Sequence, residues 1–245
     1  MLFRSAALKK GLDTLVVDLD PQGNATSLLR SQRGRGTAAT ALADPGEEST
    51  LAAIAASGWR AASGRVRLMA SDPELITFDA WKPERKLRPR LARALRHIPE
   101  QELILIDCPP SLGALTREAL AASDLAVVVT TPSYFGAQGA DRAIAEIKEI
   151  KATLNPDLEF AGVVVNRMKE KTEEHRWRKK ELVTLYGAGA VLKPSIPDRV
   201  AIQQAESPGE PLHALKSSGA REVAKDFDKL LGRLLRIAKE QQADS

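Results

Sequence analysis

The stretch that decides the fold is LILIDCPPSLG at positions 103–113. It opens with four large aliphatic residues and then reaches an aspartate, Asp107, which is followed by two prolines, a serine and a glycine that favour turns. A strand that is apolar on both faces is typical of a parallel sheet covered by helices on both sides. Taken alone, an aspartate at a strand end often only caps the following turn. This stretch is therefore evidence for a parallel sheet, and by itself only weak evidence for a binding site.

A second stretch of the same kind is LVVDLDPQGN at positions 15–24. Here two carboxylates, Asp18 and Asp20, leave an apolar strand and enter a turn that contains proline and glycine. In open α/β sheets, ligands bind beyond the carboxyl ends of the parallel strands. Two strands that both end in aspartate therefore indicate a polar site at that edge.

The rest of the chain repeats the change from short β-branched runs to longer helical stretches, which is typical of parallel strands joined by crossover helices. We therefore predict an α/β fold with a doubly wound, mostly parallel sheet, in one domain over residues 1–245. The stretch from Gly34 to Gly64 has no strong period and is interpreted as weak helices and loops. The expected strands are Thr14–Asp18, Val66–Ala70, Leu103–Asp107, Leu125–Thr131, Phe160–Val165 and Ala190–Lys193, and the clearest helices are Glu84–His97, Gly136–Leu154 and Ala220–Lys239.

Composition excludes several classes of protein. The 245 residues include 36 Lys and Arg against 32 Asp and Glu, a net charge of +4 that suits a polyanionic partner without requiring one. The single cysteine, Cys108, allows no intramolecular disulfide, no Cys-rich zinc site and no Cys-held cluster, so a reducing cytoplasm is expected. No apolar run approaches the ~20 residues of a membrane span, and the first residues do not form a signal peptide.

At this point the chain resembles the ParA/Soj family of DNA-partitioning ATPases. DLDPQGNAT at 18–26 is similar to the segment after the family's second strand, and LILIDCPPSLG is similar to its Walker B region, in which an aspartate holds Mg²⁺ near nucleotide phosphates. The resemblance covers nearly the whole chain from Gly11 to about Lys239. It continues through TTPSYFGAQG at 130–139, VVVN at 163–166, SIPDRV at 195–200 and GEP at 209–211.

The resemblance implies an ATPase that uses ATP and Mg²⁺ and works in plasmid or chromosome segregation. Such a protein forms a homodimer around two nucleotides, binds duplex DNA without sequence preference and is stimulated by a ParB-type partner. It would be cytoplasmic and associated with the nucleoid, with no membrane partner.

The resemblance also implies roles for particular residues. Asp107 would order the Mg²⁺ shell, Asp20 would position or activate the attacking water, and Asp18 would support the site. Phosphoryl transfer depends mainly on such positioning and charge compensation. The positions similar to the family's adenine contacts are Asn166, Pro197 and Asp198.

Basic residues gather in three stretches: Lys82–Arg96, Arg167–Lys180 and the polar side of the last helix. A charged helix face is usually only solvated. Because the family's DNA-binding cations come mainly from its C-terminal part, the resemblance favours Arg199, Arg221 and Lys225 as DNA contacts.

The chain departs from the family pattern in one respect, because no KGGxGKT-type phosphate loop occurs anywhere in the 245 residues. Ser5–Gly11 instead resembles the last turns of the helix that follows this loop. We therefore expect an N-terminal truncation, an inactive chain, and a Leu103–Asp107 strand that lacks a partner on one side.

Three alternatives have other functions. A MinD-type membrane-associated positioning ATPase would need a detachable amphipathic C-terminal helix, whereas Ala220–Lys239 is predicted to pack in the core. Nitrogenase-reductase-like relatives need cluster cysteines, which the sequence lacks. A DNA-binding module that works without nucleotide stays open, because the phosphate loop is missing.

Overall fold

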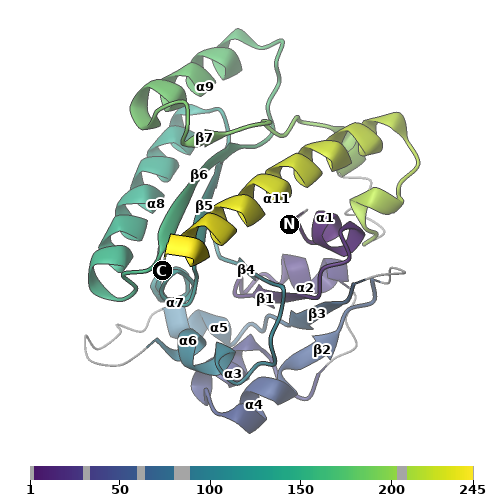
Figure 1. Ribbon diagram of the computed structural model, residues 1–245, viewed down its shortest axis with the longest axis vertical. Coiled ribbons are helices and arrows are strands. Elements are labelled where there is room, and N and C mark those ends of the chain that lie inside the picture. The colour runs from purple at the N-terminus through teal and green to yellow at the C-terminus, as the bar shows by residue number, and fades with distance from the viewer. Residues whose placement is uncertain (1–2, 30–33, 60–63, 80–88, 203–208, 245) are drawn as a thin grey trace. The chain divides into compact units, whose positions relative to one another are not determined.

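The computed structural model describes residues 3–29, 34–59, 64–79, 89–202 and 209–244. The chain folds into two compact units (Figure 1). Unit 1 contains residues 1–123 and 206–211, and unit 2 contains residues 124–205 and 212–245. Each unit has its own sheet with helices packed on it, which confirms the predicted α/β class. A single domain over residues 1–245 stays a prediction.

The sheet of unit 1 has the strand order β2-β3-β1-β4. β1 runs parallel to both β3 and β4, while β2 is antiparallel to β3. β1 and β4 have the predicted bounds, and β3 ends one residue early. β2 was not predicted, because it is a three-residue edge strand in a stretch without apolar alternation. The strands are β1 (Thr14–Asp18), β2 (Ile54–Ala56), β3 (Val66–Met69) and β4 (Leu103–Asp107).

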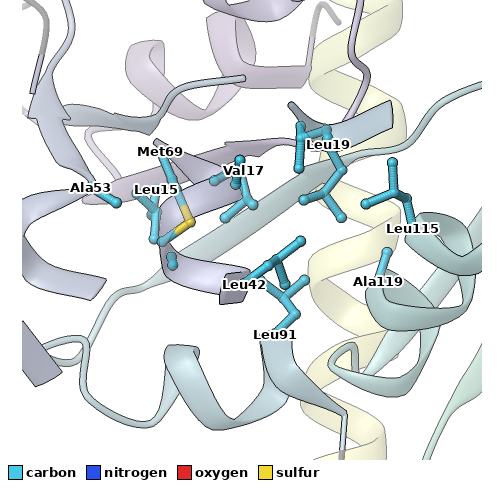
Figure 2. Packing of buried hydrophobic residues seen from close by; sticks show 13 residues of the cluster. Leu15, Val17, Leu19, Leu42, Ala53, Met69, Leu91, Leu115 and Ala119 are labelled. Carbon is cyan, nitrogen blue, oxygen red and sulfur yellow. The ribbon is translucent and has the colours of Figure 1, made fainter. Parts of the chain in front are cut away.

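Helices cover both faces of β1. Its side chains alternate between the two faces and are all buried, so each face packs against its own helices. Leu15 and Val17 pack on one face in a cluster that includes Leu42, Leu91 and Leu115 (Figure 2). Val16 points to the other face, into a separate cluster with Leu8, Leu29 and Leu68. These partners come from α1 (Phe3–Lys9), α2 (Asn24–Leu29), α3 (Ala38–Ala43), α6 (Arg90–Leu95) and α7 (Ala114–Ala121), as well as from β3. Burying each large aliphatic side chain contributes roughly 1.5–3 kcal/mol.

Two of the smaller helices of unit 1, α3 and α6, have side chains that accept from N–H groups of their first turn. Thr37 and Thr40 form a reciprocal capping box at the start of α3. α6 has no side-chain cap at Pro89, so a carboxylate oxygen of Glu118 in α7 accepts the Leu91 N–H at 2.9 Å. α6 runs from Arg90 to Leu95 and so ends two residues before the predicted end at His97, while residues 84–88 of the predicted helix Glu84–His97 lie outside the described residues. Unit 1 also contains α4 (Glu47–Ala52) and α5 (Leu75–Asp79).

β4 lies at the edge of this sheet, with β1 as its one partner among the described strands. All five β4 residues are only half-buried, whereas all five residues of β1 are buried. An apolar strand with one free edge presents unpaired N–H and C=O groups and is a place where another strand can add.

Unit 2 contains a parallel sheet with the order β5-β6-β7. α8 packs on β5 and β6, and α9 packs on β7. The predicted strands and the predicted helix Gly136–Leu154 are confirmed to within two residues, whereas α9 was seen in the sequence only as a basic stretch. The elements are β5 (Leu125–Thr130), α8 (Tyr134–Thr153), β6 (Glu159–Val165), α9 (Glu173–Tyr186) and β7 (Val191–Leu192).

The last helix of unit 2 is α11 (Ser218–Asp244), which confirms the predicted Ala220–Lys239 helix and extends it at both ends. A short 3₁₀ turn, η1 (Leu212–Ala214), precedes it, and His213 Nε2 lies 3.0 Å from Asp228 Oδ1 of α11. Among the described residues, no helix combines the length and apolar character needed to cross a membrane. The buried side chains of α11 are Ala220, Val223, Ala224, Phe227, Leu230 and Leu231.

Candidate functional site

The carboxylates predicted from the two aspartate-ended strands lie at the carboxyl end of the strands in the unit 1 sheet. Asp18 and Asp107 are paired positions in the parallel register of β1 and β4. The Leu19 N–H donates to the Asp107 carbonyl at 2.9 Å, so the strands stay paired into the turn that carries Asp20. The carboxyl ends of both strands therefore place Asp18, Asp20 and Asp107 at the same edge.

Asp18 is fully buried, and its carboxylate is held by the turn that follows it. Oδ2 accepts hydrogen bonds from the Thr26 backbone N–H and from Thr26 Oγ1, both at 2.7 Å. Oδ1 accepts from the Asp20 N–H at 3.2 Å. Burial raises the pKa of Asp18, although the Thr26 hydrogen bonds act in the opposite direction. With both oxygens occupied, this side chain shapes the turn.

Asp20 is half-buried and lies in the turn that Asp18 shapes. Its Oδ1 accepts from the Gln22 N–H at 3.0 Å, and its carbonyl accepts from the Gly23 N–H at 2.8 Å. Gly23 has a φ of 63°, a left-handed conformation that glycine adopts without strain. The turn therefore presents one Asp20 carboxylate oxygen with no hydrogen bond from a described residue.

Ser71 and Thr26 complete this turn, and the sequence analysis missed both. Ser71 Oγ donates to the Asp20 carbonyl, and the Ser71 N–H donates to Thr26 Oγ1 at 2.8 Å. Ser71 follows shortly after β3, so the rule that selected Asp18 and Asp107 would also have selected it. The end of β3 is thereby tied to the start of α2.

Asp107 is half-buried, and no described residue donates a hydrogen bond to its carboxylate. Burial and the Asp107 charge raise the pKa of the neighbouring Cys108 thiol to about 12, which favours the protonated thiol near neutral pH. Among the described residues, no three His, Cys, Asp or Glu side chains are close enough to hold a metal ion. The carboxylates at this edge suit Mg²⁺, which usually takes one or two carboxylates and completes its shell with water and phosphate.

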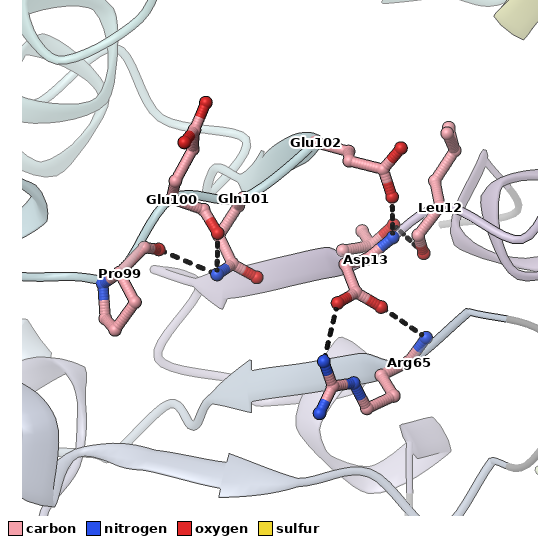
Figure 3. Close-up of polar contacts among 8 residues, drawn as sticks. Leu12, Asp13, Arg65, Pro99, Glu100, Gln101 and Glu102 are labelled. Atoms are coloured by element: carbon pink, nitrogen blue, oxygen red, sulfur yellow. Dashed lines mark hydrogen bonds and ion pairs between the residues drawn. The ribbon is translucent and has the colours of Figure 1, made fainter.

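The opposite end of the unit 1 sheet carries a different acidic cluster (Figure 3). The Asp13 N–H donates to Glu102 Oε2 at 2.7 Å, and Arg65 Nη2 lies 2.9 Å from Asp13 Oδ2. The hydrogen bond from Arg65 lowers the pKa of Asp13. These contacts join the loops that lead into β1, β3 and β4, so we interpret this cluster as structural.

In unit 2, the predicted Asn166, Pro197 and Asp198 gather at the carboxyl end of β6. The Asn166 N–H donates to the Thr130 carbonyl at 2.7 Å, and Met168 pairs with Pro197 in an isolated β-bridge. The Asp198 N–H donates to the Met168 carbonyl at 3.0 Å, and Lys169 Nζ lies 3.3 Å from its carboxylate. The segment between them is constrained, because Arg167 has a φ of 55°, which is uncommon for a residue other than glycine.

The predicted DNA contacts also lie in unit 2, and they differ in whether a carboxylate lies close to the cation. Arg221 and Lys225 are exposed and lie one turn apart on α11. Arg199 Nη2 lies 3.5 Å from Glu222 Oε2, so its charge is partly compensated. At the helical repeat of 100° per residue, the same face of α11 also carries further exposed cations. These are Lys229, Arg236 and Lys239. Of the predicted basic stretch Lys82–Arg96, residues 82–88 lie outside the described residues.

Comparison with known proteins gives consistent relatives. The family model described as an AAA domain matches residues 3–160. The chain is 32% identical over 225 residues to the sporulation initiation inhibitor protein Soj of Bacillus subtilis, covering 89% of this chain and 86% of that protein. It is 32% identical over 212 residues to the chromosome partitioning protein ParA of Myxococcus xanthus, covering 84% and 72%.

A solved structure supports the fold. The cobyrinic acid a,c-diamide synthase of Mycobacterium smegmatis, with a bound ATP analogue and magnesium, matches with a TM-score of 0.77 over 96% of this chain and 86% of that one. The sequence identity is 24%, so this likeness bears on the fold alone.

Proposed function

Because this chain belongs to the ParA/Soj family of chromosome-partitioning ATPases, we propose that it serves DNA segregation as an ATP-dependent switch. In the ATP state it forms a homodimer, binds duplex DNA without sequence preference and responds to a ParB-type partner in the cytoplasm, on the nucleoid. The observation that carries this proposal is the meeting of Asp18, Asp20 and Asp107 at the carboxyl edge of β1 and β4.

The three aspartates have separate roles in this proposal. Asp107, whose carboxylate accepts no hydrogen bond from the described residues, holds Mg²⁺, mainly through water, and the ion would supply charge compensation for phosphate oxygens. Asp20 has one carboxylate oxygen to which no described residue donates, and it orients the attacking water. Asp18 is buried and fully hydrogen-bonded, so it positions Asp20 through the main chain.

The adenine side of the site belongs to unit 2 in this proposal. Asn166 and the Pro197–Asp198 segment present amide and backbone groups at the carboxyl end of β6, where ligands of α/β sheets bind. The Asp198 carboxylate is paired with Lys169 and the Asp198 N–H donates to the Met168 carbonyl, so both groups hold this segment beside Asn166. The 245 residues contain no glycine-rich phosphate loop, so we propose that nucleotide turnover requires one joined to this chain.

DNA binding is assigned to the exposed basic face of α11. Arg221 and Lys225 are the central contacts, and Arg199 contributes less because Glu222 compensates its charge. The stripe from Arg221 to Lys239 spans 18 residue steps, about 27 Å of helix at 1.5 Å per residue. A row of cations of this length can follow a phosphate backbone without reading the bases.

The competing function is that of a MinD-like membrane-associated ATPase, which would release its last helix to a bilayer. Two contacts oppose this function. Arg233 Nη2 donates to the Gly189 carbonyl at 2.9 Å, and Gln241 Nε2 donates to the Asp157 carbonyl at 2.6 Å. Both hold the second half of α11 on unit 2.

The test uses the chain joined to a strand and a KGGxGKT-type loop, with binding to duplex DNA and to anionic vesicles measured in parallel. We expect ATP-dependent DNA binding whose affinity falls steeply with salt, because bound counterions are released. Arg221→Glu with Lys225→Glu should weaken it and lower the salt slope by about 2, one for each lost phosphate contact.

The matched control is Arg142→Glu with Lys148→Glu, two exposed cations on α8. Equal DNA binding with and without ATP would contradict the switch and favour a DNA-binding module that works without nucleotide. Binding to vesicles in place of DNA would favour the MinD-like function.

A further inference from the structure

Arg167 is the extra residue of a bulge at the carboxyl end of β6. In regular parallel pairing, the Ile196 N–H that donates to the Val165 carbonyl at 2.8 Å would be followed by an Arg167 N–H donating to the Ile196 carbonyl. Met168 makes that second bond instead, at 2.9 Å. The chain between Val165 and Met168 is therefore one residue longer than regular pairing needs. Bulges redirect a side chain and are frequent beside active sites.

The bulge holds Arg167 in an unfavourable backbone conformation. Among the described residues, Arg167 is the one residue other than glycine with a positive φ, at 55°. This conformation is disfavoured because the Cβ atom comes too close to the following carbonyl oxygen. It is imposed from both sides, since the Asn166 N–H donates to the Thr130 carbonyl and Met168 is buried. Residues held in this way cluster at functional sites.

The bulge also orients the side chain of Asn166. The Arg167 N–H, which is released from the regular pairing, donates to Asn166 Oδ1 at 2.9 Å. The NH₂ group of Asn166 remains as a donor. Pro197 pairs with Met168 in the β-bridge, and no described residue donates to the Pro197 carbonyl. An NH₂ donor and a carbonyl acceptor complement the edge of a nucleobase, whereas a carbonyl oxygen repels a phosphate.

The Arg167 guanidinium is exposed and has no anionic partner among the described residues. The Asp198 carboxylate of the neighbouring segment lies 3.3 Å from Lys169 and is paired with it. A guanidinium is planar and weakly hydrated, so it stacks on aromatic rings better than an ammonium group does. Stacking covers the face of a ring and leaves its edge open to groups such as the Asn166 amide.

We propose that Arg167 is a further nucleotide-binding residue, whose guanidinium stacks on the face of the bound base. This inference rests on the proposed function, in which Asn166 and the Pro197–Asp198 segment form the adenine side of the site. The bulge then serves both contacts, because it presents the Arg167 side chain and orients the Asn166 amide. Every base has a π-face, so this stacking strengthens binding without selecting adenine, and selection is left to the edge contacts.

The test is binding of adenosine to the full 245-residue chain, since adenosine needs no phosphate loop. Saturation-transfer NMR uses dilute protein, and adenosine raised to about 10 mM makes weak binding visible by mass action. We expect Arg167→Gly to weaken adenosine binding about fivefold, through the loss of one cation–π contact. Glycine adopts a φ of 55° without strain, so the bulge is kept. The control is Lys171→Gly, which removes another exposed cation of the same loop.

Inosine and AMP show which part of the nucleotide Arg167 contacts. Both share the two-ring face of adenosine, so Arg167→Gly should weaken each of them by the same factor as adenosine. A larger loss for AMP would show that the guanidinium pairs with phosphate, and this would overturn the stacking. Arg167→Lys should recover little of the binding, because an ammonium group has no flat face. Adenosine binding that Arg167→Gly leaves unchanged would also overturn the proposal.

Asn166→Ala separates this inference from the proposed function. If Asn166→Ala weakens adenosine binding and Arg167→Gly does not, the adenine site stands and the stacking is refuted. If the wild type binds no adenosine, or if neither variant changes its binding, the stacking and the adenine site are both refuted. The segregation function is tested apart from this, by the ATP-dependent DNA binding described above. Circular dichroism checks that each variant is folded.

Discussion

At the scale of single residues, the two aspartates of the DLD sequence have different environments although they are two positions apart. Asp18 is buried and accepts three hydrogen bonds, two of them from Thr26. Asp20 is half-buried, and its main chain is held by Ser71. In the proposed function, Asp18 therefore acts through the turn, and Asp20 is the carboxylate that faces a ligand.

The Thr26 hydroxyl joins Asp18 to the end of β3, and we predict that Thr26→Val destabilises unit 1. The substitution removes a donor from a buried carboxylate and an acceptor from the Ser71 N–H, at a cost of roughly 1–3 kcal/mol in the free energy of unfolding. Urea denaturation measures this loss. Thr26→Ser keeps the hydroxyl and should recover most of the stability, so equal stability of the valine variant and the wild type would contradict the role given to Thr26.

Asp20 and Asp107 should fail differently when each is replaced by alanine in a chain joined to a phosphate loop. Asp20→Ala should keep ATP binding and dimerisation but lower turnover by about 100-fold or more, because it removes a group that positions water. Asp107→Ala should weaken Mg²⁺-dependent nucleotide binding itself. Binding and turnover measured separately distinguish the two outcomes. Asp157→Ala, in an exposed loop of unit 2, is the control, and wild-type turnover in either site variant would refute the assignment.

At the scale of secondary structure, β1 and β4 differ in the number of strands that pair with them. Both are apolar and end in aspartate, but β1 has a partner on each side and β4 has a described partner on one side. Neighbouring residues of a strand direct their backbone groups alternately to the two sides. About half of the β4 N–H groups therefore face away from β1.

We predict that hydrogen exchange separates these two strands. The amides of β1 should all be protected, while in β4 protection should alternate between the β1 side and the free edge. Joining an apolar strand and a phosphate loop to the chain should then slow exchange at the unprotected β4 amides. Amide exchange followed by NMR gives this residue by residue. Uniform protection of β4 in the unmodified chain would show that its outer edge is already covered.

At the scale of the whole molecule, nucleotide binding depends on what the 245 residues contain. The carboxyl edge of β1 and β4 presents carboxylates, but the sequence has no KGGxGKT-type loop whose N–H groups and lysine could hold the β- and γ-phosphates. An edge of carboxylates alone repels a phosphate chain, because like charges at short range raise each other's energy.

We predict that the chain by itself shows no magnesium-dependent ATP binding by calorimetry and that it aggregates readily through the apolar edge of β4. Joining a strand and a glycine-rich loop should restore binding and improve solubility together. A loop with its lysine replaced by alanine should improve solubility without restoring binding, which separates the two effects. Micromolar ATP binding by the unmodified chain would disprove this view and reveal a different phosphate site.

The sequence by itself determined the features that depend on neighbouring residues. The bounds of β1 and β4 follow from apolar runs stopped by turn residues, and the stripe of α8 follows from isoleucines at helical spacing. The edge that carries Asp18, Asp20 and Asp107 was predictable too, because parallel strands place their carboxyl ends together. Family motifs in the same segments identified the relatives.

Only the tertiary structure decided how these elements are used. Ser71 reaches Asp20 across 51 positions of the chain, and Thr26 accepts from Ser71 across 45, so their roles depend on strands that pair far along the sequence. The order β2-β3-β1-β4 leaves β4 at an edge, although its sequence is as apolar as that of β1. Trp177 is exposed because Leu182 occupies the buried side of α9. Burial and pairing depend on which distant segments pack together, and local sequence patterns do not contain that information.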